Sequence, residues 1–144
     1  HAVVSDETGT DLVFAREGFC GHGCAGLVSD DMPENATKTV HRTVTLDKIV
    51  QDFEVPKVID YLSLDVEGWE EAVMSSFPFT THTIMSASVE RPTPGLMRMF
   101  EDHQLVAVRR VLHDVLFVNR RHPEFDDVMM RHHDPSSMSL LLYA

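Results

Sequence analysis

Residues 58–64, together with the Asp65 that follows them, are the feature that most constrains how this chain folds. The segment reads Val-Ile-Asp-Tyr-Leu-Ser-Leu and is mostly apolar. An apolar run of this density is typical of a strand that is covered on both faces, as in a parallel sheet. Gly68 lies just beyond it and permits a sharp turn of the backbone. The segment therefore predicts a buried strand of an α/β domain, with acidic side chains at its carboxyl end.

The rest of the chain alternates between helical and extended patterns. Thr45 is suited to cap a short helix that ends before Pro56. The expected helices cover residues 45–53, 69–77 and 96–103, and the expected strands cover residues 58–65, 83–90, 105–111 and 115–119. This order predicts a doubly wound, mostly parallel sheet with an antiparallel closing strand.

The two ends of the chain have weaker patterns. Residues 2–4 and 11–14 are short β-prone runs on either side of a turn-rich spacer, which predicts a hairpin. Residues 16–39 lose periodicity and are expected to form an irregular insertion. We expect residues 1–119 to form the C-terminal part of one domain and residues 120–144 to form a polar tail.

Composition excludes several classes of partner. The chain has 144 residues, which suits one domain, and its formal charge of −11 argues against binding to nucleic acid or to an anionic membrane. No apolar run is long enough to span a membrane. We therefore expect a soluble, cytoplasmic protein, and the sequence leaves its oligomeric state open.

Three carboxylates are the strongest candidates for chemistry. Asp65 and Glu67 follow the buried strand, and Glu90 ends the next expected strand. In an open α/β sheet, ligands bind beyond the carboxyl ends of the strands, so these side chains are expected to converge there. They could bind a divalent metal, hold the amino group of a cofactor, or deprotonate a hydroxyl. Alternatively, Asp65 caps the following helix, Glu67 complements its dipole, and Glu90 pairs with Arg91.

Other acidic residues are weaker candidates. Asp47 lies in the first expected helix, Asp60 lies early in its strand, and Asp114 lies in the expected turn before the last strand. The position of Asp60 favours a structural role. No serine nucleophile elbow is visible, which argues against a hydrolase of that type.

Three further motifs are more simply explained as loop or tail. Residues 21–26 match a dinucleotide-binding glycine pattern, but they lack the strand before and the helix after that this pattern needs. Cys20, His22 and Cys24 supply only three zinc ligands with no second cluster, so a glycine-rich loop is favoured. Residues 131–134, Arg-His-His-Asp, could form a weak metal site but are better explained as a solvated tail.

The segment 59–70, Ile-Asp-Tyr-Leu-Ser-Leu-Asp-Val-Glu-Gly-Trp-Glu, resembles the FkbM family of methyltransferases, in which an apolar strand ends in Asp-x-Glu-Gly-x-Glu. The Thr-Leu-Asp sequence at residues 45–47 also resembles the start of that family's helix. Weaker similarities extend over residues 1–119, at 2–9, 88–90 and 114–118.

The resemblance implies a Rossmann-like sheet that binds S-adenosyl-L-methionine and transfers its methyl group, usually to an oxygen. It implies that Asp65 and Glu67 face the methyl donor and acceptor and that Glu90 lines the acceptor side. Ala2 and Val3 would lie near the adenine. Gly68 would let the backbone approach the cofactor closely.

The resemblance also implies that part of the family's domain precedes His1. The family's first strand with its glycine-rich turn, and the acidic end of its second strand, have no counterpart here. We therefore expect a fragment whose N-terminal strands are missing and whose cofactor site is incomplete.

Three functions remain open from the sequence. The first is an S-adenosylmethionine-dependent methyltransferase that acts on a small molecule or glycan and has no resident metal. The second is a non-catalytic α/β interaction module. The third is a divalent-metal-dependent hydrolase built on Asp65, Glu67 and Glu90.

Overall fold

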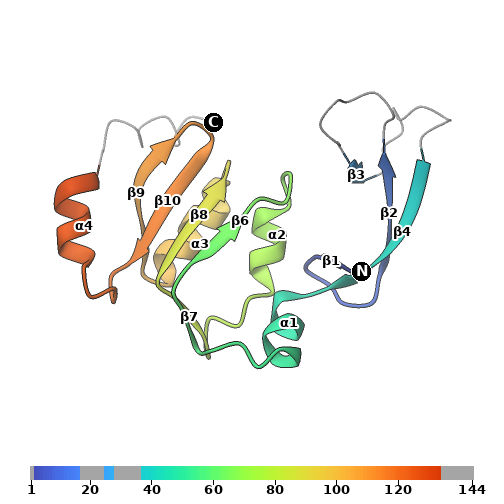
Figure 1. Cartoon of the computed structure of the whole chain (residues 1–144), viewed down its shortest axis with the longest axis horizontal. Helices are drawn as coiled ribbons and strands as arrows, with labels where there is room; N and C mark the ends of the chain where they lie inside the picture. The colour runs from blue at the N-terminus through green and yellow to red at the C-terminus, as the bar shows by residue number, and fades with distance from the viewer. Residues whose placement is uncertain (1, 17–24, 28–36, 134–144) are drawn as a thin grey trace.

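The computed structural model describes residues 2–16, 25–27 and 37–133 of the chain. Its strands and helices form two sheets of four strands, a short strand pair and flanking helices (Figure 1). In chain order they are β1 (Ala2–Val4), β2 (Asp11–Arg16), β3 (Ala25–Leu27), β4 (Thr37–Val44), α1 (Leu46–Asp52), β5 (Val58–Ile59), β6 (Leu62–Leu64), α2 (Glu70–Ser75), β7 (Thr83–Ile84), β8 (Ser86–Glu90), α3 (Pro94–Asp102), β9 (Leu105–Val111), β10 (Asp114–Asn119) and α4 (Phe125–His132).

The sheet that carries the acidic residues has the strand order β6-β8-β10-β9. Strands β6 and β8 run parallel, whereas β10 is antiparallel to both β8 and β9. The short pair β5 and β7 is also parallel and lies just before β6 and β8 in the chain. The predicted strand at 58–65 is therefore present as two short strands, interrupted at Asp60 and Tyr61, and the strand at 83–90 is interrupted at Met85.

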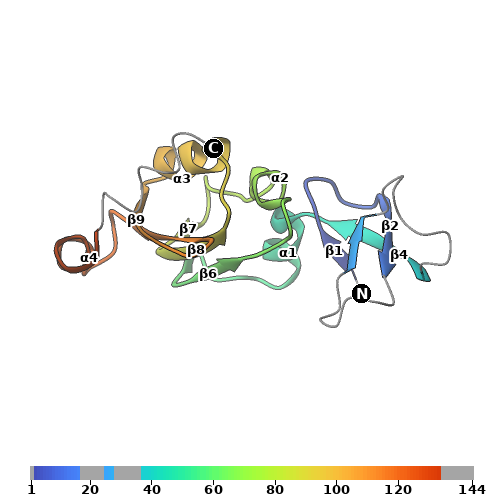
Figure 2. The ribbon, with the colours of Figure 1, turned by 90° about the horizontal axis from the view of Figure 1, so that it is seen from above.

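Helices α2 and α3 lie on one face of this sheet (Figure 2). Between them and the sheet is the core, where Val89, Leu96, Phe100, Val115 and Phe117 are at most 2% exposed. The rings of Phe100 and Phe117 meet edge to face, with centroids 4.9 Å apart. Burial of these large side chains is the main favourable contribution to holding the helices on the sheet.

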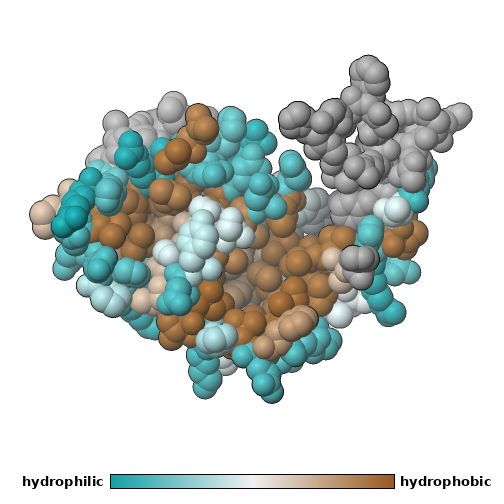
Figure 3. Space-filling view, in the orientation of Figure 1, coloured by the Kyte–Doolittle hydropathy of each residue, from teal (hydrophilic) through white to brown (hydrophobic). Residues whose placement is uncertain are grey.

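The opposite face of the sheet is not covered by α2 or α3. This face is turned toward the viewer in Figure 3, which shows apolar side chains gathered across its middle. Leu116 is 37% exposed and Tyr61 is 57% exposed, with the Tyr61 hydroxyl 2.6 Å from the Ser88 Oγ. The second helical layer of a doubly wound sheet therefore stays a prediction.

Local sequence accounts for where two helices begin. The Thr45 hydroxyl accepts a hydrogen bond from the Lys48 amide, as expected for the cap of α1. The Thr93 hydroxyl caps α3 in the same way through the Leu96 amide, and Pro94 occupies the first helical turn, where its missing N–H costs nothing. Helix α3 thus begins at Pro94, slightly earlier than the pattern predicts.

The predicted hairpin of residues 2–4 and 11–14 is wrong. Strand β4 lies between the two, parallel to β1 and antiparallel to β2. The connecting loop is bound to β4, because the Gly9 amide donates to the Thr43 carbonyl and the Thr43 amide donates to the Thr10 carbonyl. An eight-residue strand offers both of its edges, so each short strand pairs with it rather than with the other.

Two other predictions need correction. The region 16–39 is not wholly irregular, since β2 extends to Arg16, β3 covers Ala25–Leu27 and β4 begins at Thr37. The sheets are mixed rather than mostly parallel, with three parallel and four antiparallel pairings among the described strands. The tight β9–β10 turn forces those strands antiparallel, and β10 inserts between β8 and β9 instead of closing the edge.

Helix α4 lies in the segment that the sequence predicts to be a polar tail. It contacts β9, and Phe125, Val128 and Met129 on it are partly buried. The Arg120 guanidinium lies 5.7 Å from the centre of the Phe125 ring. Within the described residues, no helix has the length and apolar character needed to cross a membrane.

We predict that Phe100→Ala lowers the free energy of unfolding by about 3 to 5 kcal/mol, because the truncation leaves a cavity in a fully packed core. Urea denaturation followed by circular dichroism measures the change. Met130→Ala is the control, because Met130 is 83% exposed and its truncation is expected to change stability by no more than about 0.5 kcal/mol.

Candidate active site

A cluster of three carboxylates lies beyond the carboxyl ends of β6 and β8. The two strands are parallel, and Leu64 is opposite Val89, so the residues that follow them lie at the same edge of the sheet. Asp65, Glu70 and Glu90 each place a carboxylate oxygen within 4.8 Å of the others. The predicted convergence of Asp65 and Glu90 is therefore observed, but the third member of the cluster is Glu70 and not the predicted Glu67.

Glu70 is the member of the cluster to which the sequence interpretation assigned no role. It is 2% exposed, and its Oε1 accepts hydrogen bonds from the Val66 amide at 3.0 Å and the Gly68 amide at 3.1 Å. A buried carboxylate needs such partners, because an unpaired one would lose its hydration without compensation. The sequence signals for this role are its position on the first turn of the helix, two residues after Gly68, and its place as the last residue of the Asp-x-Glu-Gly-x-Glu motif.

Glu67 and Gly68 form the turn that Glu70 holds. Both have positive φ, 55° for Glu67 and 96° for Gly68. A left-handed conformation suits glycine but is unusual for glutamate, so the neighbouring structure must stabilise Glu67 there. A Cβ placed on Gly68 would have no neighbouring atom within 4 Å, which means that the space above this backbone is open.

The ionisation of Glu90 is perturbed by its surroundings. Burial raises the pKa of its carboxyl above the ordinary value of 4.5, and the nearby charges of Asp65 and Glu67 raise it further, as does a side-chain hydrogen bond with Asp65. The Arg91 guanidinium, 3.3 Å from Glu90 Oε1, opposes these effects. The predicted ion pair with Arg91 therefore exists alongside the carboxylate cluster.

Ala2 and Val3, the predicted adenine contacts, lie elsewhere. Both belong to β1 in the other sheet, where they are opposite Arg42 and Thr43 of β4. Figures 1 and 2 show this sheet on the far side of α1 and α2 from β6. The described contacts do not bring Ala2 or Val3 to the carboxylate cluster, so their part in the site stays a prediction.

The other acidic candidates are not members of the cluster. Asp47 lies in the first turn of α1 and accepts a hydrogen bond of 2.7 Å from the Gln51 Nε2. Asp60 is exposed between β5 and β6, and Asp114 is exposed at the start of β10. In the pairing of β8 with β10, the main chain of Asp114 lies opposite that of Glu90.

The remaining sequence motifs are only partly described. Cys20, His22 and Cys24 lie outside the described residues, as do residues 21–24 of the glycine pattern. Arg131 lies in α4 and pairs with Asp127 at 2.9 Å. Asp134 lies outside the described residues.

An α/β arrangement with acidic groups beyond the carboxyl ends of two parallel strands is consistent with a methyltransferase-like fold. The model of the methyltransferase FkbM domain matches residues 4–131, and the chain belongs to that family. A search of curated proteins and a search of solved structures each found no match. The family match extends through most of α4, beyond the region in which the resemblance was recognised.

We predict that Glu90→Gln stabilises the chain more at pH 7 than at pH 4. The raised pKa means that folding favours protonated Glu90, so its stabilising contribution is complete below pH 4.5 and is lost as pH rises through the pKa of the folded state. Glutamine cannot ionise and avoids that loss. Thermal melts at both pH values measure the difference, with the exposed Glu101→Gln as the control. An equal shift of the melting temperature at both pH values would contradict the raised pKa of Glu90.

We predict that Glu70→Ala destabilises the chain far more than Glu70→Gln. Alanine leaves the Val66 and Gly68 amides without their acceptor. Each amide that stays buried is expected to lower the free energy of unfolding by about 1 to 3 kcal/mol. Glutamine keeps an oxygen at that position. Denaturant unfolding measures both variants, and equal effects would show that the two hydrogen bonds do not stabilise the turn.

Proposed function

We propose that this domain transfers a methyl group from S-adenosyl-L-methionine to an oxygen of a small molecule or glycan. The observation that carries the proposal is the carboxylate cluster at the carboxyl ends of β6 and β8, in a chain that belongs to the FkbM methyltransferase family. This is the edge of an α/β sheet at which ligands bind. Membership of the family supports methyl transfer, and the geometry supports this edge as its location.

The residues present suit a cationic cofactor. S-adenosyl-L-methionine carries a sulfonium and an amino group, and when bound it supplies the electrophilic methyl group. In our proposal Asp65 accepts hydrogen bonds from the cofactor, and the open backbone at Gly68 allows it to approach closely. Glu70 holds the turn that carries both residues, through its two hydrogen bonds to main-chain amides.

Glu90 and Glu67 are proposed to serve the acceptor. A carboxylate whose pKa is raised accepts a proton more readily at neutral pH than an ordinary one, so Glu90 is suited to take the proton of an acceptor hydroxyl. Glu67 is exposed on the turn beside it and is placed to orient that hydroxyl. Most of the rate enhancement in such a site would come from holding the reactants in line.

A divalent-metal-dependent hydrolase is the second candidate, because three carboxylate oxygens within 4.8 Å resemble the ligand set of a hard cation. One oxygen of Glu70 already accepts two main-chain hydrogen bonds, which leaves fewer oxygens for a metal. The methyltransferase proposal needs no metal and agrees with the family.

We predict that Asp65→Asn weakens the binding of S-adenosyl-L-methionine and of S-adenosylhomocysteine by about tenfold or more, because it removes a charge-assisted hydrogen bond. Isothermal titration calorimetry measures binding to the full-length protein. Asp60→Asn is the matched control, since Asp60 is an exposed aspartate near the other end of the same strand segment.

Three outcomes separate the candidates. Cofactor binding that Asp65→Asn weakens and Asp60→Asn leaves unchanged supports the methyltransferase. Failure of the protein to bind the cofactor overturns the proposal and leaves the non-catalytic interaction module. Failure to bind the cofactor, combined with Mg²⁺ or Mn²⁺ binding that Asp65→Asn abolishes, favours the hydrolase.

A further inference from the structure

A cavity lies at the opposite edge of the sheet from the carboxylate cluster. It has a volume of about 240 Å³ and lies where β7 begins, α3 ends and the chain leaves β10. Because β6 and β8 are parallel, their carboxyl ends carry the cluster at the other edge. The two sites are therefore separate, and the cavity has no part in the proposed methyl transfer.

Asn119 holds the walls of this cavity together. It is 1% exposed, and its Nδ2 donates to the Ile84 carbonyl at 2.9 Å and to the His103 carbonyl at 3.4 Å. Its Oδ1 accepts a hydrogen bond of 2.9 Å from the Arg121 amide. A single buried side chain thus fixes β7, the end of α3 and the main chain of Arg121, so the cavity is preformed.

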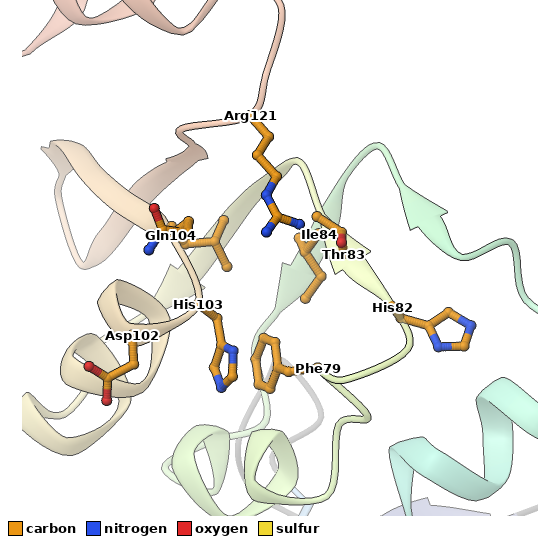
Figure 4. A pocket seen from close by; sticks show the side chains of 9 residues that line it. Phe79, His82, Thr83, Ile84, Asp102, His103, Gln104 and Arg121 are labelled. Carbon is orange, nitrogen blue, oxygen red and sulfur yellow. The ribbon is translucent and has the colours of Figure 1, made fainter.

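The Arg121 side chain reaches over the cavity (Figure 4). Its guanidinium lies near Ile84 and Thr83, whereas the carboxylate of Asp102 is turned away from it. Among the described residues, Arg121 forms no ion pair. An arginine fork that is not committed to a carboxylate is available to bind an anion with two parallel hydrogen bonds.

The Phe79 and His103 side chains form an aromatic wall of the cavity below Arg121. The rings of Phe79 and His103 are stacked, with centroids 4.0 Å apart and an angle of 3° between their planes (Figure 4). His82 is already engaged, since its Nδ1 is 2.9 Å from the Thr81 Oγ1 and its Nε2 is 3.2 Å from the Val55 carbonyl. Besides His82, the cavity is lined by the Arg121 guanidinium, the aromatic wall and the polar side chains of Thr83, Asp102 and Gln104.

We propose that this cavity binds a small anion whose charged end is a phosphate or a carboxylate. Arg121 holds the charged end, and the Phe79–His103 wall contacts the rest of the ligand. The volume is below the roughly 300 to 1,000 Å³ of pockets that hold drug-sized ligands, which restricts the ligand to a small one. A bound cation is disfavoured, because the guanidinium would repel it.

Nuclear magnetic resonance titrations of the folded chain test this site, with inorganic phosphate and benzoate as the probes. Phosphate tests the charged end alone, and benzoate adds a flat ring that can contact the aromatic wall. We expect saturable shifts of the Thr83, Gln104 and Arg121 amides at millimolar probe. Arg121→Gln is expected to weaken binding by about tenfold or more, because the ligand loses a charge-assisted contact.

Arg120→Gln is the matched control, because it removes the same charge from the neighbouring residue, whose guanidinium lies over the Phe125 ring. The site is supported if Arg121→Gln weakens probe binding and Arg120→Gln changes the dissociation constant by no more than about twofold. Tighter binding of benzoate identifies a carboxylate ligand with a flat body, and tighter binding of phosphate identifies a phosphate ligand. The proposal is overturned if neither probe gives saturable shifts, or if both arginine variants weaken binding equally.

Discussion

The hydrogen bonds between the buried Glu70 carboxylate and the amides of Val66 and Gly68 are the constraint on which the site depends. They hold the turn after β6 in a conformation where Glu67 and Gly68 both have positive φ. Without an acceptor inside the turn, two main-chain donors would lose their partners, and the turn that follows Asp65 would lose two of its hydrogen bonds. Glu70 is thus a positioning residue whose carboxylate also lies within 4.8 Å of those of Asp65 and Glu90.

Packing of α2 and α3 on the sheet fixes the position of this turn relative to β8. Helix α2 carries Glu70 and buries Val73 and Met74, while α3 buries Leu96 and Phe100 against the same face. The Thr93 hydroxyl at the cap of α3 donates to the Glu71 carboxylate and so connects the two helix starts. The elements that bear the acidic residues are therefore held by the core, while the carboxylates themselves lie at the edge of the sheet.

The sequence predicted the parts of this structure that depend on local pattern. Periodicity and composition predicted the apolar strand before Asp65, the Thr45 cap and the parallel arrangement of β6 and β8. The proximity of Asp65 and Glu90 followed from that arrangement. The place of β4 between β1 and β2 did not follow, because pairing between distant segments leaves no local signal. The role of Glu70 was missed because an acidic residue in the first turn of a helix is ordinarily explained by the helix dipole.

The central claim is that the carboxylate edge of β6 and β8 is where the cofactor binds. The most direct measurement is a set of intermolecular nuclear Overhauser effects between S-adenosyl-L-methionine with a ¹³C-labelled methyl group and the protein. The account predicts contacts from that methyl to protons of Val66, Glu67 and Gly68. Contacts confined to the Arg121 cavity or to the uncovered face of the sheet would contradict it.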